Sequence, residues 1–176
     1  MTRRFCLVGL TFAVCSTLVS AQGVALQLNL LLGTWKQNLA KSTYNPGPPP
    51  TFVSVRQYAA GDAGSIVAVT MTISPDGLPS LGAVAAANYD GKDYVQHTLA
   101  TLASSLASHV EPKVDRTISY TLTDPYTVEI VIKQGGRVVS RATRTISRDG
   151  KSMTERSTST DGSGRPVVNV LVFEKQ

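Results

Sequence analysis

One pair of opposite charges in the sequence is spaced so that it could contact a bound molecule. Asp149-Gly150 is a strong signal for a two-residue hairpin turn, because both central residues of such a turn must accept a positive φ angle. In regular strands this turn places three pairs of residues opposite each other: Arg148 with Lys151, Ile146 with Met153, and Arg144 with Glu155. The turn therefore predicts a cross-strand ion pair between Arg144 and Glu155.

The direction in which this pair points depends on which strand face is interior. The more apolar face carries Val138, Ala142 and Ile146. If that face is interior, Arg144 and Glu155 also point inward. This orientation requires a three-residue or bulged turn at Gly135-Gly136. A regular two-residue turn would instead put Val139 and Arg141 inside. An interior pair could orient a ligand carboxylate, or its two members could satisfy each other, which the cost of an unpaired buried charge favours.

The other candidate ligand contacts are apolar or aromatic. Two neighbouring strands each alternate between an apolar and a polar face, which is the pattern of half-buried strands. The apolar faces, one tryptophan near the N-terminus and the ion pair form the candidate site: Trp35, Tyr120, Tyr126, Val128, Ile130, Ile132, Arg144 and Glu155. For the tryptophan, a structural role is favoured over ligand contact, because a large aromatic ring can close a barrel end.

The sequence contains none of the common catalytic or metal-binding patterns. There is no G-x-S-x-G motif, and His97 and His109 have no acid or thiol nearby at metal-ligand spacing. The Asp-Gly pairs are not part of a D-x-D-x-D-G calcium loop and are interpreted as turns. We therefore expect no enzyme activity, no metal and no cofactor.

Composition indicates one folded domain. The 176 residues are 42% hydrophobic and 16% charged, which is too apolar and too weakly charged for a disordered protein. The net charge of +5 is spread along the chain without a basic block or interleaved aromatic residues, so nucleic-acid binding is not expected. The expected oligomeric state is a monomer.

Short runs rich in Val, Ile, Thr and Tyr alternate with turn signals, which predicts strands joined by tight turns. Ten strands are expected, near residues 33–38, 52–59, 65–73, 80–89, 92–97, 115–122, 126–134, 138–147, 152–160 and 166–174. Without long crossovers, a closed barrel hides the strand edges best. The predicted fold class is all-β, an antiparallel up-and-down β-barrel of about eight to ten strands.

Three segments depart from the strand pattern. The residues 46–50, Pro-Gly-Pro-Pro-Pro, predict an extended connector. Residues 98–110 place apolar side chains at helical spacing, which predicts a short inserted helix that either plugs one barrel end or forms a mobile lid over a ligand entrance. The leucine-rich residues 23–32 could form a short N-terminal helix against the base of the barrel.

The first 21 residues have the composition of a secretory signal peptide. Arg3 and Arg4 precede an apolar run over residues 5–19, and Val19-Ser20-Ala21 supplies small residues for cleavage. The run is short for a transmembrane helix, and no later stretch is long enough to be one. The sequence thus predicts a signal peptide over residues 1–21, a single barrel domain over residues 22–176, no transmembrane segment after processing, and a periplasmic or secreted location.

Several short motifs resemble a known superfamily. Gly33-Thr34-Trp35-Lys36-Gln37-Asn38, followed by Lys41-Ser42 and Pro46-Gly47-Pro48, is similar to the lipocalin and fatty-acid-binding-protein superfamily, most closely to small exported bacterial lipocalin-like proteins. The turns at residues 89–94 and at Asp149-Gly150-Lys151 extend the likeness over residues 33–176. The lipocalin disulfide is absent, and the proline-rich connector replaces the lipocalin omega loop.

The resemblance implies a calycin barrel whose interior can hold an apolar molecule. It also implies that Trp35 packs across the closed end near an arginine from a late strand, for which Arg144 and Arg156 are both candidates. The expected function is binding of a small apolar or amphipathic ligand inside the barrel. The alternative is an envelope interaction or structural protein with a filled barrel.

Overall fold

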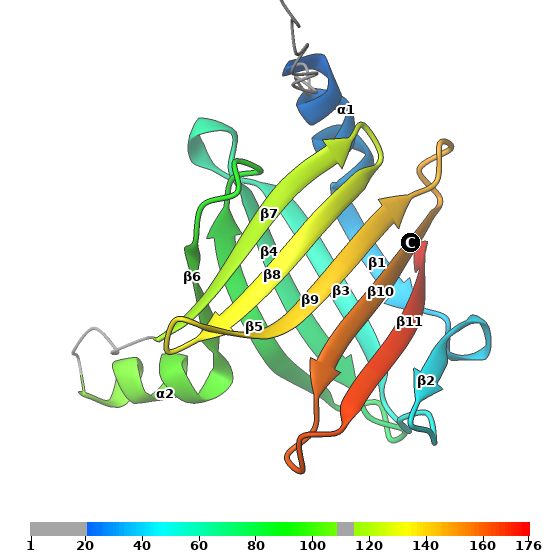
Figure 1. Cartoon of the computed structure of the whole chain (residues 1–176), viewed down its shortest axis with the longest axis vertical. Coiled ribbons are helices and arrows are strands. Elements are labelled where there is room, and N and C mark those ends of the chain that lie inside the picture. Colours follow the sequence, from blue (N-terminus) through cyan, green and yellow to red (C-terminus); the bar gives the residue numbers. More distant parts are fainter. Residues whose placement is uncertain (1–20, 109–114) are drawn as a thin grey trace, which may run out of the picture.

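The computed structural model describes residues 21–108 and 115–176 as a β-barrel with a short α-helix at each end (Figure 1). The helices are α1 (Ala21–Leu31) and α2 (Leu99–Ser108). The first six strands are β1 (Gly33–Gln37), β2 (Thr43–Asn45), β3 (Val53–Ala60), β4 (Ile66–Ile73), β5 (Pro79–Ala87) and β6 (Tyr94–Thr98). The others are β7 (Arg116–Asp124), β8 (Thr127–Gln134), β9 (Arg137–Ile146), β10 (Ser152–Thr160) and β11 (Pro166–Lys175).

Ten strands close the barrel. β1 and β3 to β11 pair antiparallel in the order of the sequence, and β1 also pairs with β11, which closes the ring. This confirms the predicted all-β, antiparallel up-and-down barrel and both short helices. The strand β2 was not predicted: it has three residues, too few to show alternation, and pairs with β11 outside the ring.

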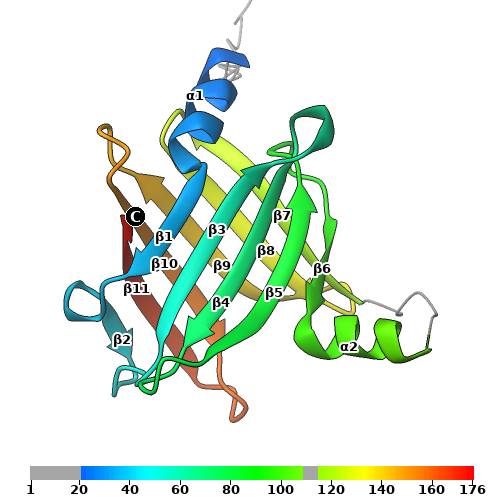
Figure 2. The ribbon, with the colours of Figure 1, turned by 180° about the vertical axis from the view of Figure 1, so that it is seen from behind.

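One end of the barrel is closed by a packed core. α1 projects from this end (Figures 1 and 2), and its last residue, Leu31, packs there in a buried cluster with Trp35, Phe173 and four other residues. The chain passes from α1 into β1 at Gly33, whose φ of +119° is open to glycine and strained for other residues. A Cβ atom there would also lie 3.1 Å from Lys175 Cε.

The inserted helix α2 lies at the opposite end of the barrel, where it follows β6 without a linker (Figure 2). It contacts β5 and β6, and none of its described side chains lines the cavity of the barrel. The last two residues of its predicted span, 109 and 110, lie outside the described residues. Among the described helices, none has the length and apolar character needed to cross a membrane.

The strands on either side of Asp149-Gly150 pair in the predicted register, but the predicted two-residue turn is wrong: residues 148–151 form the loop, and Ser147 N–H donates to the carbonyl of Ser152. Ile146 pairs with Met153 and Arg144 pairs with Glu155, while Arg148 and Lys151 belong to the turn itself. The structure settles the direction that the sequence left open: Arg144 and Glu155 point inward, since both line the interior cavity and only 4% and 7% of their surfaces are exposed.

The turn at Gly135-Gly136 differs in detail from the expectation. The turn has two residues, since Gln134 pairs with Arg137, and the irregularity lies farther along, where Ile132 pairs with Ser140 and Lys133 with Val138. Val139 is thus an extra residue in β9. Placing Val138 in the interior was wrong: the bulge shifts it to the face of Lys133, and 44% of its surface is exposed.

Candidate ligand-binding cavity

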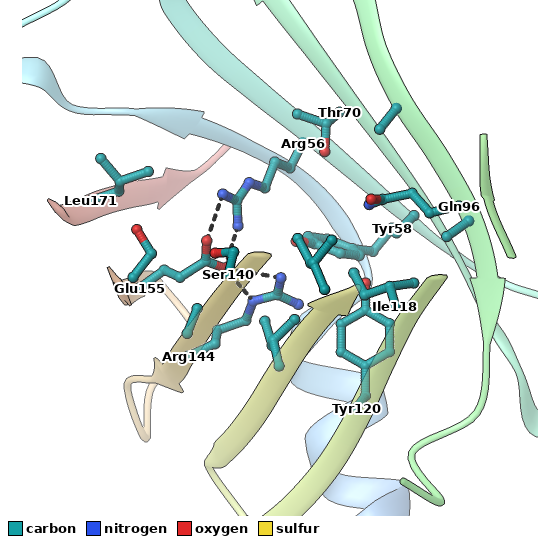
Figure 3. Close-up of a pocket in the computed structure, with 17 residues that line it drawn as sticks. Arg56, Tyr58, Thr70, Gln96, Ile118, Tyr120, Ser140, Arg144, Glu155 and Leu171 are labelled. Carbon is teal, nitrogen blue, oxygen red and sulfur yellow. Dashed lines mark hydrogen bonds and ion pairs between the residues drawn. The ribbon is translucent and has the colours of Figure 1, made fainter. Parts of the chain in front are cut away.

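The barrel interior contains a cavity of about 260 Å³. Every barrel strand except β1 contributes to the seventeen residues that line it (Figure 3). Alternate residues of each strand point inward, so the lining follows from the two-residue period of a β-strand. Residues from strands that are far apart in the sequence therefore meet around this cavity.

A cluster of three charged side chains forms one wall of this cavity (Figure 3). Arg56 of β3 donates to both carboxylate oxygens of Glu155, from Nη1 at 2.6 Å and from Nη2 at 2.8 Å. Arg144 donates to one of these oxygens, from Nε at 3.1 Å and from Nη2 at 3.0 Å. The carboxylate therefore bridges two guanidinium groups that belong to opposite sides of the barrel.

Aromatic rings hold both guanidinium groups in place. The guanidinium carbon of Arg56 lies 4.4 Å from the ring centroid of Phe173. That of Arg144 lies 5.1 Å from the ring centroid of Tyr58 and 5.7 Å from that of Tyr120. Such cation–π contacts are stronger in a desolvated site, so they favour the charged form of both arginines.

The charged cluster carries one net positive charge at neutral pH. Burial alone would raise the pKa of Glu155, but the guanidinium groups of Arg56 and Arg144 outweigh it and lower that pKa to about 2. Burial also disfavours the charged form of Arg56, but the carboxylate of Glu155 raises its pKa above the usual value. Burial raises the pKa of Tyr120 to about 12, so its phenol is neutral.

The cluster also keeps hydrogen-bond donors unused. Arg56 Nε is buried and has no hydrogen-bond partner in the described part of the chain. Arg144 Nη1 and the buried hydroxyl of Tyr89 also lack a well-aligned partner there, although the Arg144 guanidinium is near enough to Tyr89 to oppose the rise in its pKa that burial causes. A buried donor without a partner costs about 1–3 kcal/mol, more for a charged group. The cluster is therefore suited to receive an acceptor with negative charge.

The rest of the lining is largely apolar. Small side chains line β4, β5 and β9, which keeps the interior open, and isoleucines line β7 and β8. These apolar residues are Ala68, Ala83, Ala85, Ala142, Ile118, Ile130 and Ile132. A molecule with a hydrocarbon body and one acidic group would match both walls.

Five of the eight candidate residues line the cavity together, namely Tyr120, Ile130, Ile132, Arg144 and Glu155. The other three do not line it. Trp35 and Val128 are fully buried in the two hydrophobic clusters of the barrel, and the ring of Tyr126 lies 5.2 Å from the guanidinium carbon of Arg148 in the turn region. Trp35 thus has the structural role that the sequence favoured.

The cation beside Trp35 is a lysine. Lys175 Nζ lies 5.3 Å from a ring centroid of Trp35 and donates to the carbonyl oxygen of Leu30 at 2.8 Å. Neither arginine candidate takes this place: Arg144 lies between tyrosines in the cavity, and Arg156 is exposed on β10.

Sequence reasoning missed Arg56, the second cation of the cluster. In β3 the valines at 53 and 55 alternate with Ser54 and Arg56, so the usual pattern would place the valines inside and Arg56 outside. The structure has the reverse orientation. The one signal that could have indicated Arg56 was Tyr58 on the same face, an aromatic residue that needs burial.

Comparison with known proteins identifies the fold. No family model matches the sequence, and no curated protein does. The fluorescent protein UnaG is 14% identical and superposes with a TM-score of 0.53 over 85% of this chain and 99% of UnaG. Rv2717c from M. tuberculosis is 14% identical, with a TM-score of 0.52 over 87% of this chain and 97% of its own.

A zebrafish ileal bile-acid-binding protein, solved with cholic acid, is 14% identical and aligns over 84% of this chain and 99% of its own. Its TM-score of 0.47 is too low to add to the fold assignment. Since the identities are low, the likeness concerns the fold alone. The chain has the fold of UnaG and Rv2717c, a closed antiparallel up-and-down β-barrel, which is the fold that the short motifs around Trp35 and the later turns implied.

Proposed function

We propose that this protein is an exported binding protein that carries or stores a small amphipathic molecule with one acidic group. The observation that supports the proposal most directly is the charged cluster at the cavity wall. It holds one net positive charge and unused donors on Arg56 and Arg144 inside an otherwise largely apolar cavity. An acidic group placed there would neutralise the charge and accept from those donors.

The apolar wall can supply enough affinity for such a ligand. Burying a hydrocarbon chain gains about 0.8 kcal/mol per methylene, and micromolar affinity corresponds to about 8 kcal/mol. About ten enclosed methylenes would therefore reach this range before the costs of association are counted. A fatty-acid-sized or isoprenoid-like molecule fits this description.

The alternative function is interaction with another envelope protein. It is favoured by exposed apolar side chains, among them Leu78 with 65% and Phe52 with 43% of its surface exposed. It does not account for an interior cavity of about 260 Å³ beside a cluster with unused donors. Ligand binding therefore takes first place.

Displacement of a fluorescent fatty acid tests the proposal. Dansyl-labelled undecanoic acid should bind saturably, and unlabelled fatty acids of similar length should displace it. Ile130→Trp should abolish binding, because Ile130 lines the cavity and a larger ring would fill it. Glu129→Trp, which adds the same ring to the exposed face of the same strand, should leave binding unchanged.

A second comparison tests the acidic group. The methyl ester of the same probe should bind about tenfold more weakly or worse, because it cannot form charge-assisted hydrogen bonds. Equal affinity for acid and ester would remove the charged cluster from the binding site. If neither probe binds saturably to folded protein, the binding function is wrong and the interaction protein becomes the leading proposal.

Export has a separate test. Protein secreted from cells should begin at Gln22, because Val19-Ser20-Ala21 offers small residues at the cleavage positions. Intact-mass measurement of the secreted protein checks this. A retained N-terminus, or a lipid attached at Cys15, would contradict the proposed processing.

A further inference from the structure

The neighbouring strands of the barrel wall with the fewest residue pairs between them are β6 and β7. Only two residue pairs join these strands, Tyr94 with Ile118 and Val95 with Thr117. By contrast, β7 and β8 are joined by eight pairs. On its other side β6 is joined to β5 by three pairs. Segments with few backbone hydrogen bonds open at a lower free-energy cost than the rest of a protein.

A side-chain hydrogen bond spans the place where the two strands separate. The next pair after Val95 and Thr117 would be Gln96 with Arg116, and the backbone pairing stops before it. Instead, Arg116 Nε donates to Gln96 Oε1 at 2.7 Å. Gln96 lines the cavity (Figure 3), and 9% of its surface is exposed. Its bond with Arg116 therefore lies at the cavity wall.

β6 and α2 can move together. Thr98, the last residue of β6, and Thr101 in α2 form a reciprocal cap: Thr98 N–H donates to Thr101 Oγ1 at 2.9 Å, and Thr101 N–H donates to Thr98 Oγ1 at 3.4 Å. This cap fixes the start of the helix to the end of the strand. Val95 and Leu99, on either side of this junction, are 45% and 49% exposed, so little packing holds the segment from outside.

We propose that the seam between β6 and β7 is the ligand entrance, and that the bond between Gln96 and Arg116 latches it. The proposal rests on the ligand-binding function proposed above. Opening moves β6 with α2 away from β7 and exposes the cavity at Gln96. It breaks two residue pairs, the bond between Gln96 and Arg116, and the ion pair at 2.7 Å between Asp93, directly before β6, and Lys133 of β8. Two other junctions of the ring have three pairs each, β5 with β6 and β1 with β11. The junction between β1 and β11 is reinforced by β2 and by the bond from Lys41 Nζ to Glu174 at 2.8 Å.

A disulfide across the seam tests the entrance. Val95→Cys with Thr117→Cys places two thiols on directly paired residues, whose Cα separation in an antiparallel pair suits a disulfide. The control is Thr143→Cys with Arg156→Cys, an exposed pair in the continuous wall between β9 and β10. Cys6 and Cys15 are replaced by serine in both variants, so that the two introduced cysteines are the only thiols in each variant.

Stopped-flow mixing with dansyl-labelled undecanoic acid gives the association and dissociation rates. Oxidation of the seam pair should slow both rates about tenfold or more and change the Kd less than about threefold, because the barrier rises while the cavity contacts stay the same. Reduction should restore the rates, and the control pair should show no change. Equal rates in the oxidised and reduced seam variant would overturn the entrance.

Arg116→Ala provides a second test that needs no cross-link. Removing the latch should speed probe exchange about threefold or more with little change in Kd, since Arg116 does not line the cavity. Unchanged exchange in this variant would also contradict the proposal. Failure of the unaltered protein to bind the probe would instead overturn the binding function, and the entrance with it.

Discussion

Glu155→Ala is expected to lower the free energy of unfolding by about 3–5 kcal/mol, because it leaves two buried guanidinium groups without their shared counterion. Arg56 and Arg144 both donate to this carboxylate, and their side chains are 12% and 4% exposed. Two like charges would then face each other across the interior with no compensation. Urea denaturation followed by far-UV circular dichroism measures the change.

Glu129→Ala is the matched control, since Glu129 is exposed on β8 and its loss should change stability by less than about 0.5 kcal/mol. An equally small effect for Glu155→Ala would show that solvent reaches and stabilises the two arginines. In that case more water would reach the cavity than the low exposure of the two arginine side chains indicates. The proposed acidic ligand would then gain less from the cluster.

The acid dependence of stability has a definite sign. The pKa of Glu155 is about 2 in the folded protein, below the value of about 4.3 expected for an unfolded glutamate. Its contribution is therefore fully present above the unfolded value and is lost as the pH falls toward the folded value. Between pH 5 and pH 2, the wild-type protein should lose more stability than Glu155→Gln in the same urea titrations.

The strand order was predictable because turn residues carry local information. Asp149-Gly150 sets its register alone, which is why Arg144 and Glu155 could be paired from sequence. The bulge at Val139 had no such local signal. The pair of glycines forms a two-residue turn, and the extra residue lies three positions after Gly136. The position of such a bulge depends on how all the strands of the barrel pair. The sequence therefore indicated that β9 must contain an irregularity but did not indicate at which residue.

The position of Arg56 could not be predicted for a different reason. In β3 and β4 the valines alternate with the residues that line the cavity and so face outward, and Val55 is nevertheless only 8% exposed. Alternation shows that the two faces of a strand differ, but the rule that the apolar face is interior fails on strands that contribute to a charged part of the cavity wall. A barrel with a charged cluster inside reverses the pattern on the strands that supply it.

Trp35→Ala should cost about 3–5 kcal/mol of stability, the range seen when large aromatic side chains are removed from cores. Trp35 is completely buried, packs with Leu31 of α1, and donates from Nε1 to the Leu31 carbonyl at 2.7 Å. The substitution therefore removes the packing of the closed end and leaves that carbonyl without its partner. Circular dichroism must follow unfolding, because Trp35 is the only tryptophan of the chain.

Phe52→Ala is the matched control: it also removes an aromatic ring, but one that is 43% exposed, so its expected cost is within about 0.5 kcal/mol. A denaturation midpoint of Trp35→Ala equal to that of the wild type would show that the closed end does not depend on this ring. Because Trp35 does not line the cavity, the folded fraction of Trp35→Ala should bind the probe with nearly unchanged affinity. Loss of stability with retained binding would show that Trp35 stabilises the barrel and does not bind the ligand. Ligand recognition would then depend on the charged cluster.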